Sequence, residues 1–326
     1  VYDDYGNLSY VLPPKVVHDT SISSTALSEL CYQYKYDDRN RLVEKKIPGK
    51  VIEYIIYDKL DRPIITQDSN LRQQGKWLFT AYDSFGRVSY TGKVYRPSWS
   101  RQTMQNHVAG SYKLFVDKLS SSISTNNITI YYLKCFTNTT YVSDSDIEIL
   151  TINYYDNYTF EGFTSMPSVI DGQAVINYNN SSGTQKLTKG LATGSKVRVL
   201  GTSNWITTQT GYDEKGRAIY VKSVNDYLST TDIVKSTLDF TGAVTKTETL
   251  HNKAQQDSFK DLVHVSVNVD EITKTTNSNA WNAGFATNSS FSGDVYIEFT
   301  VAQNNQRLMV GLSSDNSSAS YNTIDF

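Results

Sequence analysis

The chain has few of the residues that usually carry metal binding, redox chemistry or crosslinking. Its 326 residues include 2 cysteines, 6 prolines and 4 histidines. Cys31 and Cys135 allow at most one disulfide, and two buried free thiols fit the sequence equally well. The histidines stand in unrelated contexts without metal-ligand spacing: His18, His107, His251 and His264. We therefore expect no metal site and no bound cofactor.

Net charge and long apolar runs are also lacking. The 31 Lys and Arg residues nearly balance the 33 Asp and Glu residues and are spread along the chain, so no basic field attracts nucleic acid or an anionic membrane. No stretch approaches the roughly 18 apolar residues of a membrane-spanning helix. The chain starts at Val1 without a signal peptide, and its pattern continues up to Phe326. We expect a piece of a longer protein, with targeting signals elsewhere.

The residues that are abundant favour β-structure. The chain has 24 Tyr, 12 Phe and 4 Trp, together with many Thr, Ser, Val and Ile. β-branched and aromatic residues suit the half-buried surface of a pleated sheet, so we expect an all-β fold. The length predicts at least two regions with separate cores.

A short motif recurs along the chain. Counting its first residue as position 0, the copies begin at Tyr2, Tyr36, Tyr57, Tyr82, Tyr212 and, in worn form, Leu238. Position +1 is Asp in all six copies, position +4 is Gly, Asn or Asp, and position +5 is Arg in four. The four full copies consist of Tyr36, Asp37, Asn40 and Arg41; Tyr57, Asp58, Asp61 and Arg62; Tyr82, Asp83, Gly86 and Arg87; and Tyr212, Asp213, Gly216 and Arg217.

These columns predict a hairpin turn. Gly, Asn and Asp tolerate positive φ, so position +4 is expected in the left-handed region. The Asp at +1 can accept hydrogen bonds from turn amides, and strand-forming residues flank each copy. We expect a short loop ending in a bulge, with the Arg paired to an Asp of a neighbouring hairpin or lying over a Tyr ring. On this interpretation the recurring residues at positions 0, +1, +4 and +5 form the turn and pack against neighbours, and we assign no catalytic residue.

The spacing of the copies helps to choose the architecture. Intervals range from 21 residues, between Tyr36 and Tyr57, to 130 residues, between Tyr82 and Tyr212. A propeller or solenoid keeps a steadier period. Hairpins of variable length fit an antiparallel sheet that winds on itself.

The Y-D-x-x-G-R pattern resembles the YD repeat of the RHS family, which includes bacterial polymorphic toxins, wall-associated proteins, the shells of insecticidal toxin complexes and the teneurins. Residues 32–92 resemble in particular the RHS-repeat proteins of Bacteroidetes, and the resemblance extends from Val1 to about His251. It implies a spiralling sheet that forms part of a hollow, cocoon-like shell. In the family, such a shell often encloses a toxic C-terminal domain, which is released by cleavage near a DPxGL-type motif. This sequence has no Asp-Pro pair, so neither the cleavage site nor a toxin is carried over.

The resemblance also implies a function. We expect a non-enzymatic fragment of a large secreted or surface-displayed protein, the scaffold of a polymorphic toxin in bacterial competition. The implied partners are an effector domain beyond this fragment and components of the type IX secretion translocon.

Two regions follow from the pattern. Residues 1–260 form the repeat region, with a weaker, partly inserted segment at about 96–204, in which "YYDNY" (154–158) is a degenerate copy without its Gly-Arg end. Residues 261–326 alternate strictly and have Asn- and Ser-rich turns, which resembles the start of a truncated concanavalin- or lectin-like sandwich. Trp281 and Tyr321 are candidate glycan contacts there, although Trp281 fits a sandwich core better.

Other local patterns suggest further sites. Asp144, Asp146 and Glu148 are expected on one strand face, either solvated or, less favoured, as calcium ligands. Residues 177–196 are expected to form turn and exposed loop, and "GLATGSK" within them lacks the spacing of a phosphate loop.

Two other functions remain open on the sequence alone. An adhesin would bind glycans through the C-terminal sandwich. A carbohydrate-active enzyme needs two carboxylates facing each other across a cleft, and no pair here can be singled out.

Overall fold

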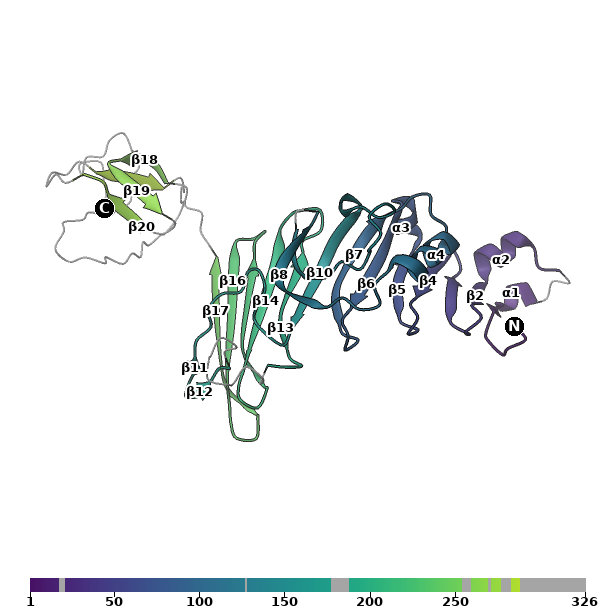
Figure 1. Cartoon of the computed structure of the whole chain (residues 1–326), viewed down its shortest axis with the longest axis horizontal. Coiled ribbons are helices and arrows are strands. Elements are labelled where there is room, and N and C mark those ends of the chain that lie inside the picture. The colour runs from purple at the N-terminus through teal and green to yellow at the C-terminus, as the bar shows by residue number, and fades with distance from the viewer. Residues whose placement is uncertain are drawn as a thin grey trace. The chain divides into compact units, whose positions relative to one another are not determined.

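The computed structural model describes residues 1–17, 21–126, 128–176, 188–253, 259–268, 271–276 and 283–287. The chain forms two compact units, Val1–Lys253 and Ala254–Phe326. Their described residues lie mainly in antiparallel strands (Figure 1), so the all-β prediction is confirmed. Within the described ranges, no helix is long and apolar enough to cross a membrane.

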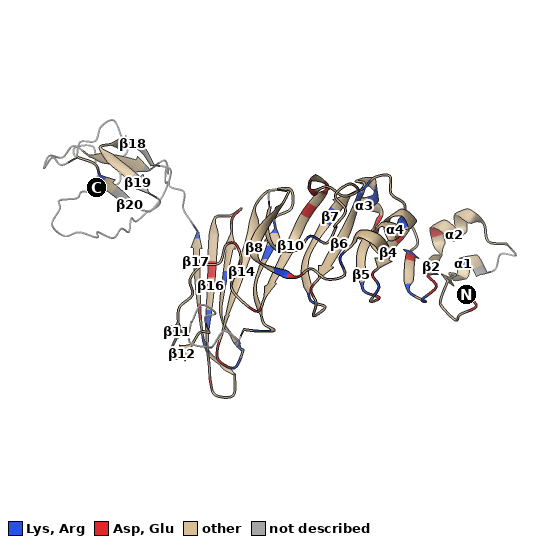
Figure 2. Cartoon of the chain, in the orientation of Figure 1, with Lys and Arg blue, Asp and Glu red and all other residues tan. Residues whose placement is uncertain are grey.

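The first unit is built on one antiparallel sheet of 13 strands, in which sheet strands that follow one another along the chain are also paired neighbours (Figure 1). The order is β1 (Tyr10–Val11), β2 (Tyr32–Tyr36), β3 (Leu42–Lys46), β4 (Glu53–Tyr57), β5 (Pro63–Gln67), β6 (Lys76–Tyr82), β7 (Val88–Tyr95), β10 (Ile147–Tyr155), β13 (Ala192–Arg198), β14 (Trp205–Tyr212), β15 (Ala218–Asn225), β16 (Thr230–Leu238) and β17 (Val244–Lys253). Lys, Arg, Asp and Glu are interspersed along this unit (Figure 2).

A bulge follows each repeat turn from the Tyr36 copy onward, as the sequence predicts. In the β4–β5 hairpin, Tyr57 pairs with Pro63 and Ile56 pairs with Ile65, which leaves Ile64 as an extra residue. Ile64 and Ile65 are consequently both buried, although they are adjacent in a strand. The same shift recurs after the other turns, where the extra residues are Val43, Ser89, Thr193, Ile219 and Thr245. Such bulges bend the strand and increase its twist.

Two long insertions pack on the sheet. The first insertion (96–146) joins β7 to β10 and contains α4 (Arg101–Ser111), the hairpin β8 (Lys118–Thr125) and β9 (Ile128–Tyr132), and the 3-10 helix η1 (Asp144–Asp146). The second insertion (157–189) joins β10 to β13 and contains β11 (Val169–Ile170) and β12 (Gln173–Ala174). Shorter helices elsewhere are α1 (Pro14–Val17), α2 (Ser24–Leu30) and α3 (Ser69–Gln73).

The insertions and the sheet share one apolar core. Its buried side chains come from the sheet (Phe79, Tyr90, Ile152), the first insertion (Val116, Ile130, Phe136) and the second insertion (Phe160). Phe79 meets Phe136 edge-on, with ring centroids 5.3 Å apart, and Tyr154 stacks on Phe160 at 4.7 Å. Aromatic pairs in these geometries add to the stabilisation from burial.

Glycines inside two strands make room for this core. A Cβ at Gly194 would lie 2.4 Å from the Phe160 ring. A Cβ at Gly92 would lie 2.5 Å from both the Glu148 carbonyl oxygen and the Phe79 ring. Glycine within a strand commonly marks such a close approach.

Two local predictions are wrong. In the predicted loop at 177–196, residues 188–190 do form a turn and 177–187 lie outside the described residues, but 192–196 belong to β13, in the middle of the sheet, where Thr193 and Lys196 are buried. Asp144 and Asp146 lie in η1 because Ser143 and Asp146 form a capping box, so only Glu148 is on a strand. Of the two alternatives for the cysteines, the structure has the free thiols, since Cys31 and Cys135 are both buried and unpaired with each other.

The described part of the second unit consists of two antiparallel pairs. β18 (Phe259–Val263) pairs with β21 (Gly284–Thr287), and β19 (Val265–Asn268) pairs with β20 (Glu271–Lys274). Trp281 and Tyr321 lie outside the described residues, as does most of the predicted sandwich at 261–326.

Replacing Gly92 by Ala should lower the free energy of unfolding by about 2 kcal/mol, because the Glu148 backbone cannot move away from the new methyl group. Urea denaturation of the purified chain measures this. Gly110→Ala in α4 is the matched control, since its Cβ meets nothing within 4 Å and alanine favours a helix by up to about 1 kcal/mol. Equal stability of Gly92→Ala and the unchanged chain would contradict the packing described.

Candidate functional site

Each repeat turn is organised by the carboxylate at position +1. In the β6–β7 turn, Asp83 Oδ1 accepts hydrogen bonds from the amides of Phe85 and Arg87, both at 2.9 Å. The Asp83 amide donates to the Arg87 carbonyl at 2.9 Å, and the Gly86 amide donates to the Asp83 carbonyl at 3.0 Å. A single aspartate therefore satisfies most polar groups of the turn, as Asx turns do.

Position +4 has positive φ in all six copies. The values are 81° at Gly6, 56° at Asn40, 61° at Asp61, 77° at Gly86, 75° at Gly216 and 97° at Gly242. Asn and Asp are the non-glycine residues that best tolerate this region. Position +4 is therefore Gly, Asn or Asp because the backbone there has a positive φ.

The arginine at position +5 returns to its own aspartate. Its Nε donates to Asp Oδ2 at 2.8 Å for Arg41, 2.8 Å for Arg62, 2.7 Å for Arg87 and 2.6 Å for Arg217. Partial burial alone would raise the pKa of Asp37 and Asp213, but hydrogen bonds from the arginine and from turn amides outweigh it, so both pKa values lie below the usual range. These carboxylates are held ionised and do not suit general-acid catalysis.

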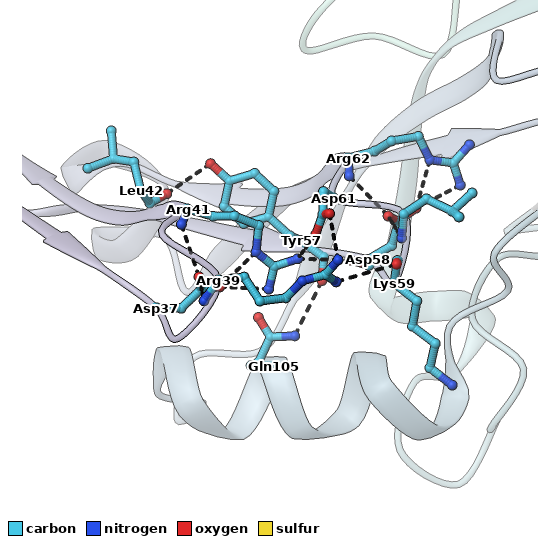
Figure 3. A network of polar contacts seen from close by, with 11 residues as sticks. Asp37, Arg39, Arg41, Leu42, Tyr57, Asp58, Lys59, Asp61, Arg62 and Gln105 are labelled. Atoms are coloured by element: carbon cyan, nitrogen blue, oxygen red, sulfur yellow. Dashed lines mark hydrogen bonds and ion pairs between the residues drawn. The ribbon is translucent and has the colours of Figure 1, made fainter. Parts of the chain in front are cut away.

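The arginines of the first three full copies also contact the following copy, and Figure 3 shows this for Arg41. Arg41 Nη1 donates to Asp61 Oδ1 at 2.6 Å and to the Asp58 carbonyl at 3.1 Å. The guanidinium carbon of Arg41 lies 4.9 Å from the Tyr57 ring centroid. In the opposite direction, the Tyr57 hydroxyl donates to the Leu42 carbonyl at 2.9 Å. Neighbouring hairpins are therefore linked both ways, in contacts that we call the turn ladder.

The ladder continues along the sheet. Arg62 lies 4.4 Å from the Tyr82 ring centroid, and the Tyr82 hydroxyl donates to the Pro63 carbonyl at 3.0 Å. Arg87 lies 4.2 Å from the Tyr155 ring centroid and binds both oxygens of Asp156, at 3.2 and 2.8 Å. A stacked, bidentate guanidinium is among the stronger polar contacts in proteins.

Tyr155 and Asp156 belong to a repeat copy that is split in two. The Asp156 amide donates to the Leu191 carbonyl at 3.0 Å, which is the bond that Asp83 makes to Arg87. Tyr155 pairs with Ala192, just as Tyr82 pairs with Val88. The second insertion therefore lies inside a repeat turn whose end is Gly190, with a φ of 88°.

The sequence at 154–158 indicates only the first half of the split copy, because no Gly-Arg end follows it. Gly190 followed by the alternating residues 191–198 was the available signal, but it lies far along the chain and lacks the arginine. Leu191 occupies position +5, so this copy supplies no guanidinium to the Tyr212 ring. The Tyr212 hydroxyl still donates to the Ala192 carbonyl, at 2.5 Å.

Lys118 of the first insertion anchors the split turn. Its Nζ donates to Asn157 Oδ1 at 2.6 Å and to the Tyr155 carbonyl at 3.3 Å. Burial lowers the pKa of Lys118 to about 8, partly offset by the nearby Asp156 carboxylate. Both insertions and the ladder thus meet at one turn.

The remaining predicted carboxylates do not converge. Asp144 pairs with Lys134, Asp146 with Arg96, and Glu148 with Lys76. Across the described ranges, no group of three or more His, Cys, Asp or Glu side chains is arranged to hold a metal ion. The residues that the structure brings together are the four full copies and Asp156, and their arrangement joins turns.

Replacing Arg87 by Lys should lower the free energy of unfolding by about 2 kcal/mol, because lysine cannot bind Asp83 and Asp156 together while lying over Tyr155. Urea denaturation measures the change. Arg217→Lys is the control, since among the described residues Arg217 pairs only with its own Asp213 and otherwise has a 3.5 Å contact to the Asp239 carbonyl. If both variants lose the same stability, the contacts between hairpins contribute nothing beyond the turn itself.

Comparisons with known proteins find no family model and no curated protein that matches the chain. Among solved structures, TcdB2-TccC3 crystal structures align with 76% of this chain and 14% of theirs, at 13% identity and a TM-score of 0.23. The TcdB2-TccC3 structure without its hypervariable C-terminal region aligns over the same shares at 14% identity and a TM-score of 0.23. A TM-score this low does not establish a shared fold. The chain spans only 14% of the length of these structures' chains, and nothing about their activity is transferred to it.

Proposed function

We propose that residues 1–253 are a section of wall in a larger, non-enzymatic β-shell that encloses or presents an effector. The observation that supports this most is the turn ladder. Its contacts run from one hairpin to the next along the sheet, between Arg41 and Tyr57, Arg62 and Tyr82, and Arg87 and Tyr155. Such contacts extend a sheet hairpin by hairpin without a second sheet to pack against.

The paired charges also favour a scaffold. At each full copy, aspartate and arginine neutralise each other, which leaves the turns without a free acid, base or nucleophile. Catalytic sites instead hold such groups unpaired and oriented toward a substrate. The proposed wall is therefore built from side chains that are already satisfied by one another.

The resemblance to RHS-repeat proteins supplies the setting of the proposal. The protein would be secreted or displayed at the cell surface, by a route such as type IX secretion, and would act in competition between bacteria. The effector would be a further domain of the same protein. The second unit would contact glycans if it completes a lectin-like sandwich.

Electron microscopy of the intact native protein tests the proposal. We expect residues 1–253 to line an enclosed space, with density for a carried domain inside it. A closed shell would also show the first and second insertions as an additional layer on the sheet. An open sheet that encloses nothing would contradict the proposal and would favour adhesion through the second unit.

A further inference from the structure

A lysine of the first insertion lies against an asparagine of the split turn. Lys118 Nζ donates a hydrogen bond to Asn157 Oδ1 at 2.6 Å. Because a C=O bond is about 1.23 Å long, Nζ lies within about 3.8 Å of the side-chain carbonyl carbon of Asn157. This separation is close to the roughly 3–3.5 Å between reacting atoms in a near-attack geometry. Lys134 and Lys196 instead pair with carboxylates, which resist attack by an amine because they are negatively charged.

The surroundings of Lys118 favour the reactive form of its amine. Its Nζ lies 5.6 Å from the ring centroid of Tyr154, and Lys118 pairs with Tyr132 in the β8–β9 hairpin. Both tyrosines are buried. Burial lowers the pKa of Lys118 to about 8, the Asp156 carboxylate partly offsets this, and the Arg87 guanidinium adds to it. At neutral pH a sizeable fraction of the amine is therefore unprotonated, which is the nucleophilic form.

Asn157 is held in place by its own hydrogen bonds. Its side-chain oxygen also accepts a hydrogen bond from the Thr159 amide at 3.0 Å. Its backbone amide donates to the Tyr155 carbonyl at 2.8 Å, and its backbone carbonyl accepts from Thr193 Oγ1 at 2.6 Å. An amide N–H directed at a carbonyl oxygen stabilises the negative charge that develops there during nucleophilic attack. The Asn157 side-chain carbonyl is therefore both fixed and polarised next to the lysine.

We propose that Lys118 and Asn157 form an intramolecular isopeptide bond, which ties the first insertion covalently to the split turn. Nζ attacks the side-chain carbonyl carbon of Asn157 and forms a new C–N bond. The bond from that carbon to Nδ2 breaks, one proton moves from Nζ to Nδ2, and this nitrogen leaves as ammonia. An amine and an amide thus give a secondary amide and ammonia, so the step needs no co-reactant. The nearby Asp156 carboxylate favours the positive charge that Nζ gains as it attacks.

The bond forms where both insertions and the turn ladder meet. Between its two ends the chain contains the β8–β9 hairpin, η1 and β10. A covalent link across these elements removes conformations from the unfolded chain, as a disulfide does, and so stabilises the fold. It also fixes the hairpin next to Asp156, which binds Arg87 of the preceding copy. This inference does not depend on the proposed shell.

Intact-mass spectrometry of the purified full chain tests the bond. We expect a mass lower than that of the sequence by one molecule of ammonia, and a branched proteolytic peptide that joins the segment around Lys118 to the segment around Asn157. Lys118→Arg should have the full mass of its sequence, because its guanidinium stays protonated and does not attack. Lys134→Arg is the matched control. Lys134 also belongs to the first insertion but pairs with Asp144, so this variant should still lose ammonia.

Two results would overturn the proposal. An unchanged chain that has the full mass of its sequence and gives no branched peptide would show that the pair is only hydrogen-bonded. A loss of ammonia that persists in Lys118→Arg would come from cyclisation of an asparagine and not from the crosslink. The mass and the branched peptide are both read from the unchanged chain, so the test does not depend on whether a variant folds.

Discussion

The structure depends on one repeated interaction, the arginine that binds the aspartate of its own turn and reaches the next hairpin. A single β-hairpin is at best marginally stable in water. Arg41 binds Asp37 of its own turn, and it also donates a hydrogen bond to Asp61 and lies over the Tyr57 ring of the next hairpin. The planar guanidinium suits this combination because it donates in several directions in one plane and stacks with its faces. Partial burial protects these contacts from solvent screening, which weakens fully exposed ion pairs.

The turn ladder consists of polar and ring contacts at the turns and does not form an apolar core. The core forms where the two insertions pack on the sheet. A one-layer sheet leaves both faces in water, and here one set of side chains, including Phe79, Tyr90 and Tyr154, is covered by the chain itself. The cover requires rings close to the strand backbone, which Gly92 and Gly194 allow. The second insertion starts inside a repeat turn, yet Tyr155 and Asp156 still receive Arg87. A copy can therefore be interrupted without breaking the ladder on its N-terminal side.

Local chemistry explains which features the sequence could predict. The positive φ at Asn40 and Asp61 and the bulge after each turn follow from residues within one short segment. The two options foreseen for the arginine, an aspartate or a tyrosine of a neighbouring hairpin, are both present at Arg41. Features that depend on distant segments were not predictable in the same way. The end of the split copy at Gly190 is recognised only through its pairing with Tyr155 and Asp156. β13 is a strand that pairs with β10 and β14, which are separate segments of the chain. Asp144 and Asp146 lie in the 3-10 helix η1 and not in the predicted strand, because Ser143 forms a capping box with Asp146 there.

The central claim is that the turn ladder joins successive hairpins into one cooperative unit, and hydrogen exchange of the native chain tests it most directly. In an Arg62→Ala variant, amide protection should fall in β4 and β5 and also in β6 and β7, because Arg62 binds Asp58 and covers Tyr82. In Arg217→Ala, where the arginine has no tyrosine ring of a following copy to cover, the loss should stay within β14 and β15. Loss confined to β4 and β5 in Arg62→Ala would contradict the account, because each hairpin would then be stabilised by its own turn alone.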